Sequence, residues 1–73
     1  MITLTIKGRI HAASKAAHER NIVLQSAELS SHGTETTAKC DELYRDAVLR
    51  WFAENAELIM GIGYPAGTLL FYN

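Results

Sequence analysis

The side chains of this chain that could bind a transition metal are three histidines and one cysteine: His11, His18, His32 and Cys40. Structural zinc sites take paired ligands about two to four residues apart. Here each candidate stands alone, seven or more residues from the next. We therefore expect no metal and no other cofactor, with His11 and His18 facing solvent from a helix and His32 in a turn.

Two pairs of side chains could support nucleophilic catalysis. Ser14 and His18 are four residues apart and would approach each other on a helix, but a nucleophile also needs an orienting acid and an oxyanion hole. Glu19 points to a neighbouring helix face, and no residue supplies the hole. Cys40 follows Lys39 near a predicted helix start, which could lower its thiol pKa, but no histidine pairs with it. We expect no catalytic residue and a chain that is not an enzyme.

A glycine-rich stretch, GIGYPAG at residues 61–67, could be read as a phosphate-binding loop. Nucleotide loops place their glycines between a strand and a helix start, where amides and the helix dipole meet the phosphate. Here the glycines follow a predicted helix and precede a predicted strand. The stretch instead predicts a turn, with Pro65 restricting φ and Gly67 taking a positive φ.

The element that dominates the second half of the chain is a predicted helix over residues 41–57, DELYRDAVLRWFAENAE. Its large apolar side chains recur at three- and four-residue spacing and therefore share one face. That face must cover another element, which we expect to be a sheet. The predicted apolar face consists of Leu43, Ala47, Val48, Trp51 and Phe52.

The first half of the chain predicts two strands around a short helix. Apolar and β-branched residues alternate with polar ones over residues 2–10, which is typical of a half-buried strand. Gly8 interrupts this pattern at a bulge or bend. The Ala-rich stretch 12–20 predicts a helix that packs closely on a sheet, and residues 22–31 predict a second strand.

The remaining strands follow a turn at residues 31–33, in which Gly33 is free to take a positive φ. Residues 34–39, TETTAK, are β-branched but carry little apolar surface. They predict a third strand that completes a hairpin and is polar because it lies at an edge or under a partner. The alternative is an irregular loop. Residues 68–73, TLLFYN, predict the last strand.

The predicted element order is therefore β-α-β-β-α-β within a single domain, residues 1–73. This order matches the ferredoxin-like plan. We predict an α+β fold in which two helices pack on one face of a small antiparallel sheet. Because that plan places its third strand inside the sheet and residues 34–39 are polar, a variant with the hairpin at an edge remains open.

Composition excludes several classes of protein. Seven basic and eight acidic residues give a net charge of −1, which argues against direct binding to nucleic acid. No stretch reaches the roughly 18–20 apolar residues of a membrane span, and no secretory signal is recognisable. One cysteine cannot form an internal disulfide. We expect a cytoplasmic protein whose small core makes a homodimer plausible.

Surfaces are the remaining candidates for function. Tyr44 and Leu49 fall beside the apolar face of the second helix, where they would be exposed anchors or would pack under the terminal loop. Lys7 and Arg9 belong to a mildly basic sheet face. Strand 34–39 could pair with its twin or with another protein. The predicted partner-binding residues are Lys7, Arg9, Glu35, Lys39, Tyr44 and Leu49.

In its layout the chain resembles small accessory proteins of bacteriophages and prophages. The likeness lies in a strand running into an Ala-rich helix (ITLTIKGRIHAASKAA) and in the closing YPAGTLLFY. In size it is similar to anti-CRISPR proteins. The resemblance implies a phage-encoded protein, in the host cytoplasm, that occludes a host defence complex such as a CRISPR-Cas effector. It supplies no matching site residues, and the chain lacks the acidity of DNA-mimicking inhibitors. The alternative is a structural or assembly protein that acts as a homo-oligomer.

Overall fold

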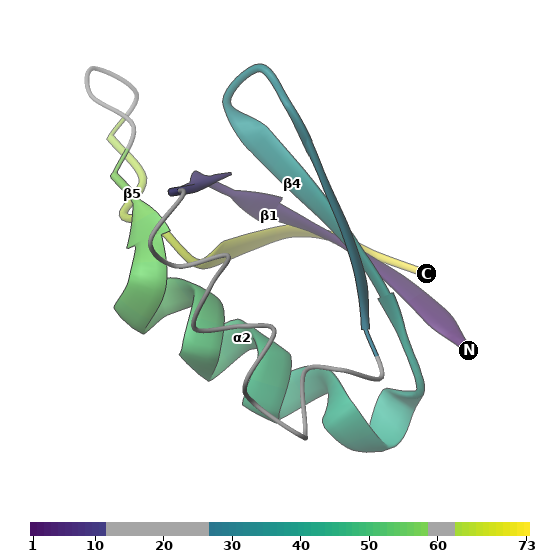
Figure 1. Ribbon diagram of the computed structural model, residues 1–73. Helices are drawn as coiled ribbons and strands as arrows, with labels where there is room; N and C mark the ends of the chain where they lie inside the picture. The colour runs from purple at the N-terminus through teal and green to yellow at the C-terminus, as the bar shows by residue number, and fades with distance from the viewer. Residues whose placement is uncertain (12–26, 59–62) are drawn as a thin grey trace.

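The computed structural model describes residues 1–11, 27–58 and 63–73, and Figure 1 shows how their elements are arranged. In chain order these elements are β1 (Ile2–Lys7), β2 (Arg9–Ile10), β3 (Glu28–His32), β4 (Glu35–Cys40), the 3-10 turn η2 (Glu42–Tyr44), α2 (Arg45–Asn55), β5 (Ala56–Glu57) and β6 (Thr68–Tyr72). The helix predicted at 12–20 and the first half of the strand predicted at 22–31 lie outside the described residues.

Four strands form an antiparallel sheet in the order β3-β4-β1-β6. A two-residue turn joins β3 to β4, and its Gly33 has a φ of 58°, which confirms the predicted positive φ. At the other end of the sheet the backbones of Thr3 and Asn73 exchange two hydrogen bonds of 3.1 and 3.0 Å. Both chain termini therefore lie at this end (Figure 1).

The predicted arrangement of two helices on one sheet face is wrong. The described residues contain one helical run, η2 followed by the 11-residue α2, and a second sheet made of β2 and β5. The cause lies at Gly8, whose φ of 131° turns the chain out of β1. Beyond it, Arg9 and Ile10 pair with the residues directly after α2. This pairing extends the backbone after Asn55, so the helix ends there.

Strand β4 lies inside the sheet, as the ferredoxin-like plan places its third strand, so the explanation of its polar composition by an edge position is wrong. Thr36, Ala38 and Cys40 alternate on one face and are completely buried. The one hydroxyl among them is satisfied, because the Thr36 Oγ1 donates to the Gly8 carbonyl at 2.9 Å and contacts the Ser31 Oγ at 3.0 Å. A strand of polar composition is thus compatible with an interior position.

The core forms where α2 crosses one face of the sheet (Figure 1). Val48, Trp51 and Phe52 are buried there, but two residues of the predicted apolar face are not. Leu43 is 83% exposed and Ala47 is exposed. Leu43 lies in η2, whose tighter winding of about three residues per turn takes it out of line with the α-helical face. Among the described residues, no helix has the length and apolarity required to cross a bilayer.

Candidate protein-binding surface

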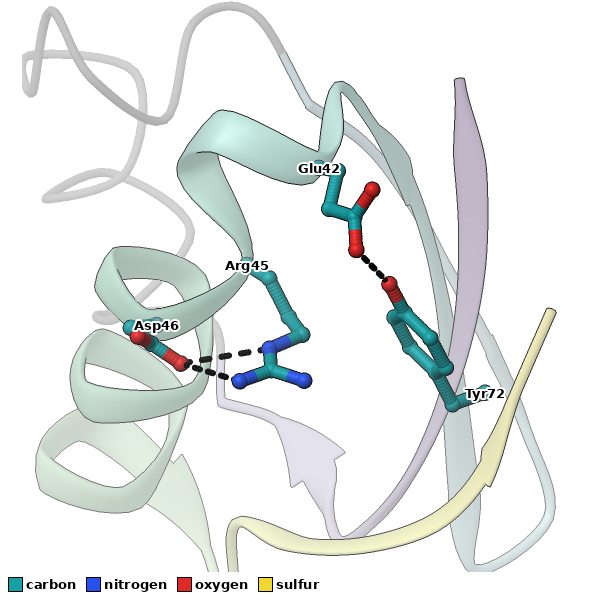
Figure 2. Close-up of polar contacts among 4 residues, drawn as sticks. All are labelled: Glu42, Arg45, Asp46 and Tyr72. Carbon is teal, nitrogen blue, oxygen red and sulfur yellow. Dashed lines mark hydrogen bonds and ion pairs between the residues drawn. The ribbon is translucent and has the colours of Figure 1, made fainter.

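A cluster of polar side chains joins the start of the helical run to the last residue of β6 (Figure 2). The Tyr72 hydroxyl donates a hydrogen bond to Oε1 of Glu42. The Arg45 guanidinium lies over the Tyr72 ring, 5.3 Å from its centroid. The same guanidinium donates through Nε and Nη2 to Oδ1 of Asp46, at 3.2 and 3.1 Å. Tyr72 is therefore held by a carboxylate at its hydroxyl and by a cation on its ring.

The fold explains why these side chains meet. Tyr72 lies opposite Leu4 of β1, so its side chain projects from the sheet face that carries the helix. Glu42 and Arg45 are three residues apart, which places both on the side of the helical run that faces β6. The backbone hydrogen bonds between Thr3 and Asn73 fix the end of β6 beside them.

Two large apolar residues that adjoin members of this cluster in the sequence are exposed. Leu43 directly follows Glu42, and Phe71, which is 64% exposed, lies opposite Thr5 on the other face of the sheet. Tyr72 itself is 41% exposed. We name this region the C-terminal edge surface; it consists of Glu42, Leu43, Arg45, Asp46, Phe71 and Tyr72.

The electrostatics of the surface follow from its contacts. The hydrogen bond to Glu42 raises the pKa of the Tyr72 phenol, and desolvation and the Glu42 charge act in the same direction, whereas Arg45 lowers it. The Arg45–Asp46 ion pair is exposed, so it adds little stability. Its effect is to orient the guanidinium over the ring. The surface thus presents an aromatic ring, a cation and two carboxylates in ordered positions.

Replacing Glu42 by alanine tests this geometry. The variant loses the hydrogen bond and the negative charge that raise the pKa of the Tyr72 phenol, so we expect the phenol to ionise at lower pH. NMR titration of ring-labelled tyrosine, assigned with Tyr72→Phe, measures this directly. The control is Asp46→Ala, which alters only the partner of Arg45 and should change the titration less. An unchanged Tyr72 titration in Glu42→Ala would contradict the contact.

Two of the sequence-predicted binding residues, Lys7 and Arg9, do not share a sheet face. Lys7 is only 4% exposed, and its Nζ donates to the Thr34 Oγ1 at 3.0 Å. Arg9 is exposed but belongs to β2, where it pairs with Glu57. The turn at Gly8 separates the two residues.

The other four predicted residues are spread over three elements, β4, η2 and α2. Glu35 and Lys39 project from β4 on the face away from the helix, where Lys39 is exposed. Tyr44 and Leu49 are half-buried and pack against the core. The structure therefore does not bring the six predicted residues together in one surface.

The residues considered for metal binding and nucleophilic chemistry are also dispersed. Within residues 1–11, 27–58 and 63–73, no three His, Cys, Asp or Glu side chains gather where they could hold a metal ion. Burial, followed by the charge of Asp41, raises the pKa of the Cys40 thiol, whereas the sequence pointed to a lowering by Lys39. Ser14 and His18 lie outside the described residues.

Sequence reasoning missed the C-terminal edge surface. Its central contact joins Glu42 to Tyr72, which are 30 residues apart, and no local spacing reveals such a pair. The available signal was the pair Phe71-Tyr72 at the end of a strand, where one of two adjacent aromatic residues must face away from the core.

The chain was compared with known proteins in three ways. No protein-family model, no curated protein and no solved structure matches the chain.

Proposed function

We propose that the chain is a protein-binding module whose partner docks on the C-terminal edge surface. The observation that carries this proposal is the position of Tyr72, held between Glu42 and Arg45, while the sequence neighbours Leu43 and Phe71 are exposed. Tyrosine and arginine are the residue types over-represented at the energetic centres of interfaces. Side chains already ordered before binding lose less conformational entropy when the partner arrives.

The partner is expected to bind through side chains rather than by adding a strand to β6. The register of β6 against β1 shifts between Thr5 and Ile6, so β6 carries one extra residue and is bulged. Bulged edges are poor templates for another strand. The complementary surface would offer an apolar pocket for Leu43 or Phe71 and charged groups for Arg45 and Glu42.

The resemblance to small phage proteins extends this proposal to a class of partner. A host defence complex, such as a CRISPR-Cas effector, would be inhibited because the bound module covers one of its working surfaces. The module would then act in the host cytoplasm without catalysis.

A comparative pull-down tests the proposal. Leu43→Ala with Phe71→Ala removes two exposed side chains and should preserve the fold, which circular dichroism checks. The matched control, Glu54→Ala, alters an exposed residue of α2 outside the C-terminal edge surface. We expect a host complex to be recovered by the wild type and by the control, and to be lost with the double variant.

The affinity of the purified host complex for the wild type and for the double variant then gives the size of the loss. Two interface anchors of about 1–2 kcal/mol each correspond to a loss of affinity of roughly 30- to 1,000-fold. Equal affinity of the wild type and the double variant, or recovery of no specific partner, would overturn the proposal.

A further inference from the structure

The two edge strands of the four-stranded sheet differ in regularity, which decides whether a strand of another molecule can pair with them. Strand β6 is bulged, whereas β3 pairs with β4 over all five of its residues without any shift of register. Four of the five β3 residues are exposed, and among the described residues β3 pairs with no strand other than β4. A regular edge of this kind presents a row of unpaired backbone groups that another strand can use.

The hairpin geometry indicates which backbone groups of β3 take no part in its pairing with β4. In a hairpin with a two-residue turn, the residues that flank the turn exchange hydrogen bonds, and hydrogen-bonded and non-bonded pairs then alternate along the strands. The flanking pair is His32 and Glu35. The N–H and C=O groups of Leu29 and Ser31 are therefore directed away from β4, toward the outer edge.

We propose that β3 pairs in antiparallel fashion with β3 of a second copy of this chain, about a two-fold axis at Ser30. This register places Leu29 opposite the partner's Ser31, so that the two outward-facing residues exchange both hydrogen bonds. The symmetry repeats the exchange on the other side of the axis. The same register places Glu28 opposite the partner's His32.

Charge complementarity selects both this register and this occupant. Glu28 lies beside Lys39 on β4, and His32 lies beside Glu35. In the paired sheet the row across the interface would read Lys39, Glu28, the partner's His32, the partner's Glu35, so each carboxylate lies next to a nitrogen donor. Moving the axis to Leu29 or Ser31 would lose both Glu–His pairs. The strand is thus complementary to itself in one register.

A shallow hollow at the interface fits this arrangement. It has a volume of about 270 Å³ and is lined by Glu28, Leu29, Ser30, Thr37 and Lys39. The partner's His32 would lie at this hollow, beside Glu28. In the single chain the His32 Nε2 contacts the neighbouring Ser30 Oγ at 3.0 Å, and both side chains are exposed. The imidazole can therefore turn toward a second copy without disturbing the core.

Complementary charge reversal tests the proposal with the full chain. Glu28→Lys replaces the carboxylate that would face the partner's His32 by an ammonium group, which cannot accept from the imidazole, and His32→Glu puts two carboxylates opposite each other. We expect each variant alone to be monomeric. An equimolar mixture of the two variants should form heterodimers, because each Lys then faces a Glu and each remaining Glu faces a His. The control Glu54→Lys makes the same charge change on α2 and should dimerise like the wild type.

Sedimentation equilibrium measures these states from about 10 µM to about 1 mM, since a contact of five residues per strand should have a Kd on the order of 100 µM. Circular dichroism checks that the variants are folded. Amide NMR shifts that depend on concentration should be largest at Leu29 and Ser31. A wild type that stays monomeric at about 1 mM, a mixture that does not associate, or single variants that still dimerise would each overturn the proposal. A different protein's strand bound at β3 in place of a second copy would overturn it too.

Discussion

Replacement of Phe52 by alanine is expected to lower the free energy of unfolding by about 3–5 kcal/mol. Phe52 is completely buried, packs beside Trp51 with their ring centroids 6.5 Å apart, and reaches the backbone at Gly8. It therefore joins α2 to the point where the chain leaves β1. Small domains have total stabilities of roughly 5–15 kcal/mol, so this loss should leave the variant close to unfolded. Urea denaturation followed by circular dichroism measures it.

The control for this prediction is Leu43→Ala. Leu43 precedes α2 by two residues and is large and apolar, but it is 83% exposed. We expect a change within about 0.5 kcal/mol. If the two variants were equally destabilised, the core would not be organised around Phe52.

Replacement of Gly67 by alanine is expected to be the second most damaging change. A Cβ at this position would lie 2.5 Å from the Ala53 Cβ and 2.9 Å from the Ala53 backbone nitrogen. The φ of Gly67 is 86°, which confirms the predicted positive φ and adds strain for any other residue. Gly67 also donates its N–H to the Lys7 carbonyl at 2.8 Å, so it cannot move away freely. Clash and strain together should cost about 2–5 kcal/mol, measured by urea denaturation.

Gly63→Ala separates the steric clash with Ala53 from the strain of a positive φ. Gly63 has a similar φ of 83°, but no atom of the described residues lies within 4 Å of the position its Cβ would take. This variant should lose only about 1–2 kcal/mol, the cost of the left-handed backbone. Equal losses at the two positions would show that β6 does not approach α2 as closely as described.

The elements that local patterns specify strongly were predictable from the sequence. Residues 2–7 alternate, and they form β1. The prediction of a strand at 34–39 agrees with β4 to within one residue at each end. The helix predicted at 41–57 is present as η2 and α2, and the last strand begins at Thr68 as predicted. In each case the repeat of side chains along the element was sufficient.

What was not predictable depends on contacts between distant segments. The two-residue strands β2 and β5 are too short to have a recognisable repeat, and they form because Gly8 redirects the chain. The sequence left the interior position of β4 open, because its buried residues are small rather than strongly apolar. Leu43 was misplaced because η2 is wound differently from the α-helix that follows it.

The C-terminal edge surface was missed for a related reason. Exposure of Phe71 depends on which sheet face α2 covers, and the contacts of Tyr72 depend on how the helical run begins. The residues predicted instead were chosen by charge and spacing. Lys7 shows the limit of that choice, since it is buried beside Thr34.

The strand order has a consequence for how strongly a target would be held. Because β3 and β6 occupy opposite edges of the sheet, joining two copies through β3 would create an eight-stranded sheet with a C-terminal edge surface at each far end. Such an assembly is bivalent. Toward a target that displays its epitope twice at a matching separation, the second attachment would proceed at a high effective concentration, and avidity could exceed single-site affinity by about 100- to 10,000-fold.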